Sequence, residues 1–395
     1  MVLVYLSFVF EYTYTVSLIY QSIVMHPMVI LVLFALAHVL NWIFLKHPFM
    51  DEQFHFKQLD TWHRLGLPTY DPMITTPPGL YLIPLLLFGG VWHIQVSLWM
   101  ARLVNLFYIL AFIHVLKGLD NYGVILNPLV VFYQSLYYTD IGALAFTLLY
   151  WKHSSMMAFF YGIMALMFRQ TSIVWILFSD LYKFVKSGEI RRSGLYLLLV
   201  FATFAYANNG IALGDREHHT VIIHLPQLLY CMTVCVFLNW PSMNVRVLFK
   251  RYWRPYWSFT AIPIVLAVHY CTFMHPYLYT DDRHLVNLFW GRFMARYEFR
   301  MAYAVFVYTP CLFLVYTSVA RRQGHLVSFL FLIFSALAVV PSPLVEPRYY
   351  MIPSIMHSIL ITPRRGKGKR VRQVMWDALT SIVLYALLYT RGLIL

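Results

Sequence analysis

The chain has 395 residues, of which 61% are hydrophobic and only 12% are charged, and its mean hydropathy is +0.65. A water-soluble fold of this length needs more polar side chains to cover its surface, so the composition excludes a soluble enzyme and favours a membrane protein. The formal net charge of +14 does not indicate nucleic-acid binding, because no soluble basic segment carries it.

The apolar residues occur in separate runs of about 12 to 20, close to the length that a helix needs to cross a bilayer. These runs do not alternate with period two, so we expect an all-α fold, a polytopic transmembrane helical bundle with about 12 to 14 spans. Residues 1–22 lack a basic beginning and contain Glu11, which disfavours a cleaved signal peptide and leaves an extra span or an interfacial helix. The predicted spans are 28–45, 98–117, 122–138, 140–151, 155–168, 171–186, 194–208, 220–240, 257–274, 301–320, 326–341, 349–361 and 373–391.

One segment, residues 46–97, is too polar at its start and too rich in proline to be a simple span. Its second half, GLYLIPLLLFGGVW, is apolar but too short to cross the bilayer, which is typical of a helix that lies in the membrane interface. We therefore expect a single membrane domain over residues 1–395 whose first lumenal loop, residues 46–97, carries interfacial helices.

The charges divide between the two sets of connections that alternate along the chain. One set holds 18 of the 30 basic residues, in runs such as KSGEIRR and PRRGKGKR, and the other set with its span ends holds 11 of the 16 acids. Short loops rich in Lys and Arg remain cytoplasmic, so the acidic set is predicted to face the lumen. The basic runs could also bind lipid headgroups.

Cysteine and histidine spacing gives no sign of a metal site. The four cysteines lie inside apolar runs without a CxxC pair, so we expect free thiols. His218 and His219 are adjacent and should point apart, and no third ligand completes a site beside them. We therefore expect no metal and no cofactor.

The sequence MDEQFH follows the first span and contains the first candidate for catalysis. A helix would place Asp51 and His55 on one face, with Glu52 pointing elsewhere. Carboxylates at a membrane boundary are costly unless they bind a ligand or stay hydrated, so this cluster is either a site or a solvated loop start. An acid here could act as the general base that deprotonates a hydroxyl.

Three further clusters lie at the lumenal ends of apolar runs. In YDPMITTPPGLY, the prolines prevent a preceding helix and a helix can begin at Gly79; the threonines either cap that helix or bind a ligand. YYTD ends at Asp140, and FRQTS contains an arginine that could simply extend to the interface. The candidate binding residues from these clusters are Asp71, Thr75, Thr76, Asp140, Arg169 and Gln170.

Three later clusters complete the lumenal set: NNGIALGDREHHT, HPYLYTDDRH and PSPLVEPRYY. Acids and cations side by side could hold a sugar or a phosphate, and an arginine at the membrane surface suits a lipid phosphate. The tyrosines beside it could instead belong to the aromatic belt. The candidate binding residues here are Asp215, His219, Asp281, Asp282, Arg283, His284, Glu346 and Arg348.

The chain contains no GxxxxGK[ST], no GxGxxG after a strand and no GxSxG motif, so nucleotide-driven transport and serine hydrolysis both lose support. A sugar on a lipid phosphate requires no nucleotide-binding fold, because the phosphate is already a leaving group and the membrane holds its tail. The sequence therefore favours a lumenal glycosyltransferase with a lipid-linked donor.

With these clusters assembled in order over residues 50–350, the chain resembles the family of dolichyl-phosphate-glucose α-1,2-glucosyltransferases of the endoplasmic reticulum. The resemblance rests on MDEQFH, DPMITTPPGLY, YYTD, FRQTSIVW, NNGIALGDREHH, HPYLYTDDRH and PLVEPRYY. It implies the C-type glycosyltransferase fold, a multi-pass protein with a lumenal site, and two lipid-linked substrates, dolichyl-phosphate-glucose and a dolichol-diphosphate-linked oligosaccharide.

The resemblance also implies an inverting transfer of glucose to a terminal glucose 2-hydroxyl in N-linked glycan precursor assembly. Mapped onto this chain, the catalytic acid is Asp51 or Glu52, and we favour Asp51. Inversion needs one base, while arginines neutralise the phosphate; the candidates are Arg348 and Arg283, supported by His284. A mannosyltransferase with the same fold and a lipid or sugar transporter are the alternatives.

Overall fold

The computed structural model describes residues 27–65, 69–91, 95–117, 122–154, 156–251, 256–276, 286–287, 290–362 and 367–391. The structure is 76% helical and the described residues contain no strand, which confirms the prediction of an all-α fold. Residues 1–22 and the cluster of Asp281, Asp282, Arg283 and His284 lie outside the described residues.

The helices follow one another along the whole chain, several of them as short or irregular segments. The first half contains α2 (Pro27–Phe44), α3 (Glu52–Leu65), α4 (Gly79–Pro84), η1 (Leu85–Val91), α5 (Leu98–Leu103), α6 (Asn105–Lys117), η2 (Tyr122–Leu126), α7 (Pro128–Tyr133), α8 (Thr139–Lys152), α9 (Met156–Phe168), α10 (Ser172–Ser187) and α11 (Ser193–Ala207). The second half contains α12 (Pro226–Leu238), η3 (Trp240–Ser242), α13 (Arg246–Arg251), α14 (Tyr256–Tyr270), η4 (Trp290–Met294), α17 (Tyr297–Tyr303), η5 (Ala304–Tyr308), α18 (Thr309–Gln323), α19 (His325–Val339), η6 (Pro347–Tyr350), α20 (Met351–Ile361) and α21 (Lys367–Arg391).

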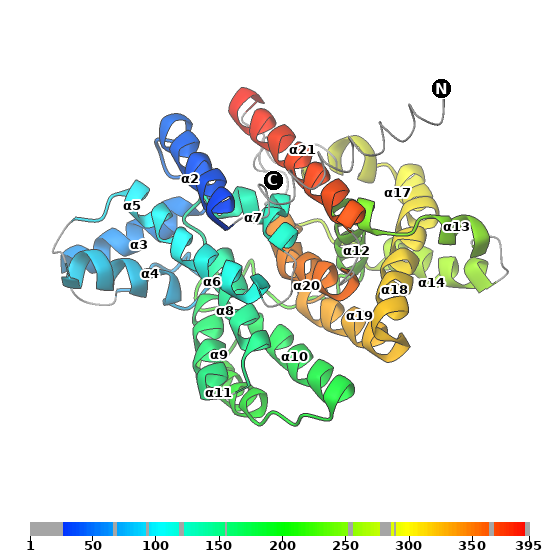
Figure 1. Ribbon diagram of the computed structural model, residues 1–395, viewed down its shortest axis with the longest axis horizontal. Coiled ribbons are helices and arrows are strands. Elements are labelled where there is room, and N and C mark those ends of the chain that lie inside the picture. The colour runs from blue at the N-terminus through cyan, green and yellow to red at the C-terminus, as the bar shows by residue number, and fades with distance from the viewer. Residues whose placement is uncertain are drawn as a thin grey trace, which may run out of the picture.

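The helices pack in two groups that meet at α10 and α19. Helices α6, α8, α9, α10 and α11 form one group, and α12, α18, α19 and α20 form the other (Figure 1). Helices α3 and α4 extend to one side of the bundle, and α21 packs along α7. A buried apolar core runs through both groups. The C-terminal ends of α9 and α19 lie near Thr75 and Thr76, where the candidate residues gather.

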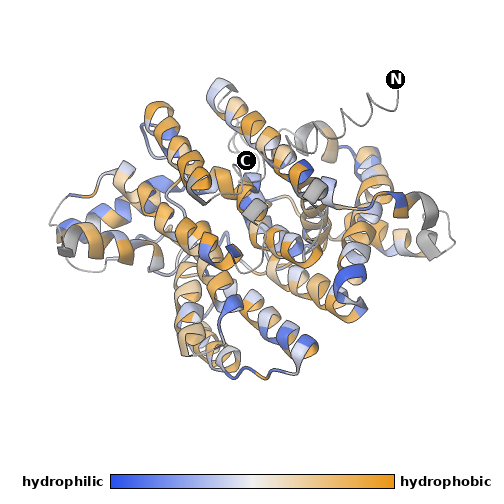
Figure 2. Ribbon diagram, viewed as in Figure 1, coloured by the Kyte–Doolittle hydropathy of each residue, from blue (hydrophilic) through white to orange (hydrophobic). Residues whose placement is uncertain are grey.

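Apolar side chains cover most of the helical surface rather than one stripe of each helix (Figure 2). Large residues such as Leu199, Phe259 and Phe306 are exposed, which is favourable only when lipid surrounds them. Helices long and apolar enough to cross a membrane cover Leu98–Lys117, Tyr297–Gln323 and Val371–Thr390, and other apolar helices are shorter. The chain is thus a multi-pass membrane protein, while the number of about 12 to 14 spans stays a prediction.

The predicted span at 122–138 is wrong. Asn127 and Pro128 begin a new helix, because the Asn127 side chain accepts a hydrogen bond from the Leu129 amide and Pro128 occupies the first turn. Helix α7 then ends at Tyr133, and residues 134–138 are not helical before α8 begins. Non-helical backbone at membrane depth needs protein partners for its polar groups.

Buried side chains from earlier helices supply these partners. The Asn105 amide donates to the carbonyl oxygens of Gln134 and Leu136, and the Asn41 amide donates to that of Ser135. The Tyr137 amide donates to the Glu52 carboxylate. Side chains of the protein thus stabilise the break in the helix, and Tyr138 beyond it contacts Phe49 and Asp51.

The interfacial helix was predicted to begin at Gly79, and α4 does begin there. A Cβ atom on Gly79 would lie 2.5 Å from the carbonyl oxygen of Met167, so only glycine lets α4 pack against the end of α9. The threonines before it do not cap the helix, since α4 has no side-chain cap. Helix α4 thereby fixes Thr75 and Thr76 beside the start of α10.

Candidate active site

Asp51 lies at the sharp turn between the first span and α3. Met50 adopts the left-handed conformation, with φ of 48°, and so reverses the chain immediately before Asp51. The Asp51 amide donates to the Tyr138 hydroxyl at 3.2 Å, and that hydroxyl donates to the Phe49 carbonyl at 3.2 Å. The turn is thereby attached to the break after α7, which holds the Asp51 backbone in place.

The Asp51 carboxylate faces a cavity of about 340 Å³, which His55, Thr75, His219 and Arg348 also line. Although the residue lies deep in the protein, its side chain is 41% exposed, because the cavity admits solvent; it contacts the Arg348 guanidinium at 2.7 Å. Burial opposes ionisation, but Arg348, together with smaller effects of His55 and His219, lowers the pKa of Asp51 below its usual value. An ionised carboxylate that faces a cavity can accept a proton from a bound hydroxyl.

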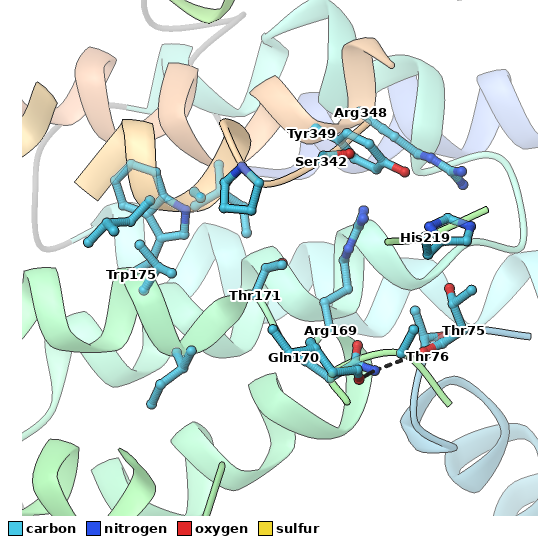
Figure 3. Close-up of a pocket in the computed structure, with 18 of the residues that line it drawn as sticks. Thr75, Thr76, Arg169, Gln170, Thr171, Trp175, His219, Ser342, Arg348 and Tyr349 are labelled. Carbon is cyan, nitrogen blue, oxygen red and sulfur yellow. Dashed lines mark hydrogen bonds between the residues drawn. The ribbon is translucent and has the colours of Figure 1, made fainter. Parts of the chain in front are cut away.

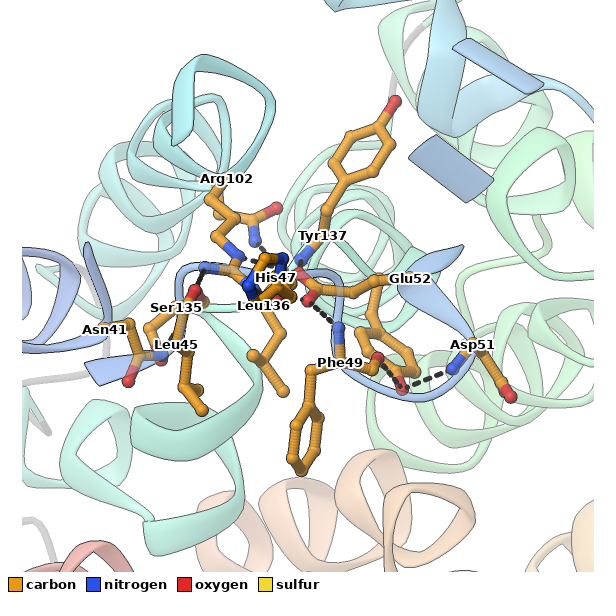
Figure 4. Close-up of polar contacts among 12 residues, drawn as sticks. Asn41, Leu45, His47, Phe49, Asp51, Glu52, Arg102, Ser135, Leu136 and Tyr137 are labelled. Atoms are coloured by element: carbon orange, nitrogen blue, oxygen red, sulfur yellow. Dashed lines mark hydrogen bonds and ion pairs between the residues drawn. The ribbon is translucent and has the colours of Figure 1, made fainter. Parts of the chain in front are cut away.

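The neighbouring Glu52 points away from the cavity and is fully buried (Figure 4). Its carboxylate contacts Arg102 through two hydrogen bonds, of 2.9 and 2.6 Å, and also accepts from the amides of Phe49 and Tyr137. Arg102 in turn donates to the carbonyl oxygens of Leu45 and His47. All of these groups are used within the protein, so Glu52 has no access to a substrate.

His55 lies beside Asp51 in the same cavity, as the predicted helical spacing required. Its Nδ1 makes a hydrogen bond of 2.7 Å with the Tyr81 hydroxyl. Burial lowers the pKa of His55 to about 4, so the imidazole is neutral near pH 7. His55 can therefore exchange a hydrogen bond with a sugar but carries no charge to pair with Asp51.

Two arginines from distant parts of the chain meet at the ring of Tyr349 (Figure 3). The guanidinium of Arg169 lies 5.0 Å from the ring centroid, and that of Arg348 lies 5.6 Å from it. Arg348 also lies 5.3 Å from the Tyr138 ring. Stacking on aromatic faces fixes a guanidinium while leaving its edge free for hydrogen bonds.

A second cavity, of about 380 Å³, adjoins the first and shares Thr75, Thr76, Arg169, His219, Arg348 and Tyr349 with it. Away from this common wall, its lining is mostly apolar and comes chiefly from α10, α11, α19, α20 and the loops at 211–221 and 341–343. The apolar lining includes Val174, Trp175, Phe201, Leu337 and Ile352. One cavity is thus polar and the other mostly apolar, and Arg169 and Arg348 lie at the wall that they share.

Residues 72–76, in the loop between α3 and α4, are held against residues 211–215. The amides of Leu213, Gly214 and Asp215 donate to the carbonyls of Thr75, Ile74 and Pro72, respectively. The Gln170 amide donates to Thr75 at 2.8 Å and to Ile211 at 2.9 Å, and so joins both segments to the start of α10. Gln170 therefore supports the cavity wall.

The prediction that His218 and His219 point apart is wrong. Asp215 has a left-handed backbone, with φ of 42°, and its carboxylate contacts His218 Nδ1 at 2.6 Å and His219 Nε2 at 3.6 Å. The tight turn brings both rings to one carboxylate, and His219 continues into the cavity. Within the described residues, no group of three or more His, Cys, Asp or Glu side chains could hold a metal ion.

Most of the predicted site residues come together. Thr76, Asp140, Arg169 and Glu346 join the residues named above at one or both cavities, and Asp140 pairs with Arg169. Asp71 does not reach either cavity, because it bonds with Lys57, the Gln58 side chain and the Met73 amide, which stabilises the loop before Thr75. The site thus draws on six separate segments of the sequence.

Sequence reasoning missed Arg102 and the bridging role of Tyr349. Arg102 lies within the apolar run 98–117, where a charged residue at membrane depth is costly unless it has a partner. That signal could have paired it with one of the acids. Nothing in the sequence could have shown that Tyr349 lies between two arginines.

A family model described as the DIE2/ALG10 family matches residues 45–193 and 185–359. A relative from Debaryomyces hansenii is 28% identical, covering 82% of this chain and 84% of the relative. A human relative is 26% identical over 80% of this chain and 84% of its own length, and one from Candida glabrata is 30% identical over 86% and 80%. Each is named Dol-P-Glc:Glc(2)Man(9)GlcNAc(2)-PP-Dol alpha-1,2-glucosyltransferase.

No solved structure matches the chain. The family match and the cavity residues coincide, since Asp51, Arg169 and Arg348 all lie inside the matched segments. Because these segments together cover most of the sequence, the chain belongs to the DIE2/ALG10 family.

Proposed function

We propose that this chain is an inverting α-1,2-glucosyltransferase that moves glucose from dolichyl-phosphate-glucose to the terminal glucose of a dolichol-diphosphate-linked oligosaccharide. The names of its relatives, which state this donor, acceptor and linkage, support the assignment. The products would enter N-linked glycan assembly, in the endoplasmic-reticulum membrane with the site on the lumenal side. The clustering of acids at the cavity end of the helices supports that orientation.

The observation that carries the proposal is the division between two consecutive acids. Asp51 faces the cavity beside Arg348, whereas Glu52 is buried and fully bonded. Of these two consecutive acids only Asp51 reaches the cavity, and an inverting transfer from a phosphate donor requires one such base opposite a cationic group. We therefore assign Asp51 as the general base.

In this reaction the acceptor hydroxyl attacks the anomeric carbon on the face opposite the phosphate. Asp51 takes the hydroxyl proton as the new glycosidic bond forms, and the bond between the anomeric carbon and the phosphate oxygen breaks with its electron pair on the phosphate. Dolichyl phosphate leaves without needing a strong acid. We propose that no cofactor takes part in this step.

The two adjoining cavities suit the two parts of such a donor. The polar cavity at Asp51 and His55 offers hydrogen-bonding groups to sugars, and Arg348 and Arg169 stand where it meets the apolar cavity. The apolar cavity, which includes Trp175, suits the first units of a prenyl chain. The sugar would thus lie toward Asp51 and the chain toward lipid.

The direct test is turnover of the purified protein in lipid vesicles, with a Glc(2)Man(9)GlcNAc(2) diphosphate lipid as acceptor. We expect one glucose to be added from dolichyl-phosphate-glucose, in α-1,2 linkage, and this to persist with a chelator present. Transfer from dolichyl-phosphate-mannose instead would establish the mannosyltransferase alternative. Movement of a lipid or sugar across the vesicle membrane without any new glycosidic bond would establish a transporter and refute the proposal.

A further inference from the structure

The two arginines at the common wall of the cavities are largely buried, yet both border open space. The side chains of Arg169 and Arg348 are 15% and 14% exposed, and both line both cavities. Arg169 lies in the turn between α9 and α10, Arg348 lies in η6 beside Tyr349, and both guanidinium groups lie near the Tyr349 ring (Figure 3). A guanidinium that is held by stacking and faces a cavity is well suited to bind an oxyanion.

Both arginines already form ion pairs with carboxylates. Arg348 contacts Asp51 at 2.7 Å and also contacts Glu346, and Arg169 contacts Asp140. Three carboxylates thus face two guanidinium groups, so these groups carry a net negative charge among themselves. A further anion can bind closely only if one of the carboxylates gives up its contact.

Asp51 is the carboxylate that can leave. Its side chain is 41% exposed, against 24% for Glu346 and 3% for Asp140. The Glu52 pair with Arg102 shows the opposite case, since both side chains are sealed at 0% and 3% exposure. An ion pair that only stabilises the fold is sealed from solvent, like Glu52 with Arg102. The Asp51–Arg348 pair instead faces the cavity, where a ligand can reach it.

We propose that Arg348 and Arg169 bind the phosphodiester of the lipid-linked donor, and that the phosphate displaces Asp51 from Arg348 and so frees Asp51 to act as the base. This inference rests on the proposed function, because it requires a phosphate donor and Asp51 as base. It adds that donor and base compete for one cation. The donor must therefore bind before Asp51 can accept a proton readily.

The charge balance of the transfer fits this arrangement. Before the reaction, the phosphodiester and Asp51 each carry one negative charge. Afterwards Asp51 holds the acceptor proton and is neutral, while the departing phosphate monoester has gained the electron pair of the broken bond. The negative charge therefore moves from Asp51 to the phosphate, and Arg348 lies where it can neutralise it throughout.

The test measures binding of dolichyl phosphate to the protein in lipid nanodiscs. Asp51→Asn should tighten binding by about 5- to 10-fold, the effect of removing one partly exposed competing ion pair, although the variant should transfer glucose about 10²- to 10⁴-fold more slowly. Asp60→Asn is the matched control, because Asp60 pairs with Arg64 on the surface of α3, away from the cavities. Its binding should be unchanged.

Dolichol and inorganic phosphate are measured in parallel. Unchanged binding of dolichol supports a phosphate site, whereas equal tightening of dolichol would overturn it. If inorganic phosphate also binds more tightly to the same degree, the site recognises the phosphate group alone. If only dolichyl phosphate binds more tightly, the site recognises the lipid donor. Both results support the exchange. The gain should disappear in the double variant Asp51→Asn, Arg348→Met.

Equal or weaker binding of dolichyl phosphate to Asp51→Asn would overturn the exchange while leaving the proposed function intact. Normal glucose transfer by the same variant would instead overturn the base assignment. Asp51→Ala provides a second variant with the same expected gain, and thermal unfolding of each protein establishes that it is folded. The two failures are therefore distinguishable.

Discussion

The carboxylates of Asp51 and Glu52, consecutive in the chain, lie in separate environments: one faces the cavity and the other is sealed against Arg102 (Figure 4). Asp51→Asn should therefore lower turnover by about 10²- to 10⁴-fold, the usual effect of losing a general base, with little change in unfolding temperature. Turnover and thermal unfolding are measured on the same preparation.

Glu52→Gln should behave in the opposite way. It removes one partner of a buried ion pair and one acceptor for the amides of Phe49 and Tyr137, which should cost about 3 to 5 kcal/mol of stability. The protein that remains folded at low temperature should retain more activity than Asp51→Asn. If Glu52→Gln unfolded like the unmodified protein but lost all turnover, the roles of the two acids would have to be reversed.

The pH dependence should follow the ion pair at Asp51. Burial alone would raise the pKa of Asp51, but Arg348, with smaller effects from His55 and His219, lowers it. The contribution of this ionised carboxylate to stability is thus present above its unfolded pKa of about 3.9 and is lost as pH falls through the lower folded value. Between pH 5 and 8, kcat/KM should show no acid limb from Asp51.

Arg348→Gln removes the cation that keeps this pKa low. The residual activity of the variant should then show an acid limb in kcat/KM at higher pH, because a buried carboxylate without its partner takes up a proton more readily. Arg64→Gln is the control, since Arg64 pairs with Asp60 outside the cavities. An unshifted profile in Arg348→Gln would mean that Arg348 does not set the ionisation of Asp51.

Gly214 lies where residues 72–76 and 211–215 are joined. A Cβ atom here would lie 2.1 Å from the Pro72 carbonyl oxygen, so Gly214→Ala should separate the two segments and reduce turnover and stability together. Gly291 has no atom within 4 Å of the same position, and Gly291→Ala should leave both unchanged. Equal behaviour of the two variants would contradict the close approach.

Topology can be tested with single added cysteines. Lys57→Cys in α3 and Ser187→Cys at the end of α10 are both exposed, and an impermeant thiol reagent should label them from opposite sides of sealed microsomes. The native thiols are free, and three of the four are buried, so Cys271→Ser provides the background. Labelling of both positions from one side would contradict a lumenal site.

Much of this architecture could be predicted from local patterns. Proline and glycine at 77–79 determine where α4 begins, and helical spacing places Asp51 and His55 in one cavity. The break at 134–138 was missed because it directly follows an apolar run, and the side chains that satisfy its backbone, Asn41 and Asn105, lie in other helices. Local preference is overridden wherever distant side chains satisfy the backbone.

The same limit applies to the site. Composition and order identified the clusters that contain Arg169, Glu346 and Arg348, since each is polar at the end of an apolar run. Which carboxylate each arginine contacts depends on tertiary packing, because the Arg169–Asp140 pair joins the end of α9 to α8 and the Arg348–Asp51 pair joins η6 to the turn before α3. Asp71, polar in the same way, instead stabilises a loop.

The break after α7 also bears on how the protein is made. The backbone carbonyls of residues 134–136 and the Tyr137 amide form hydrogen bonds with the side chains of Asn41, Glu52 and Asn105. All three side chains precede the break in the chain. Synthesis from the N-terminus therefore produces the partners before the segment that needs them. When residues 134–137 are synthesised, their hydrogen-bonding partners have already been made, which limits the time these groups spend unsatisfied.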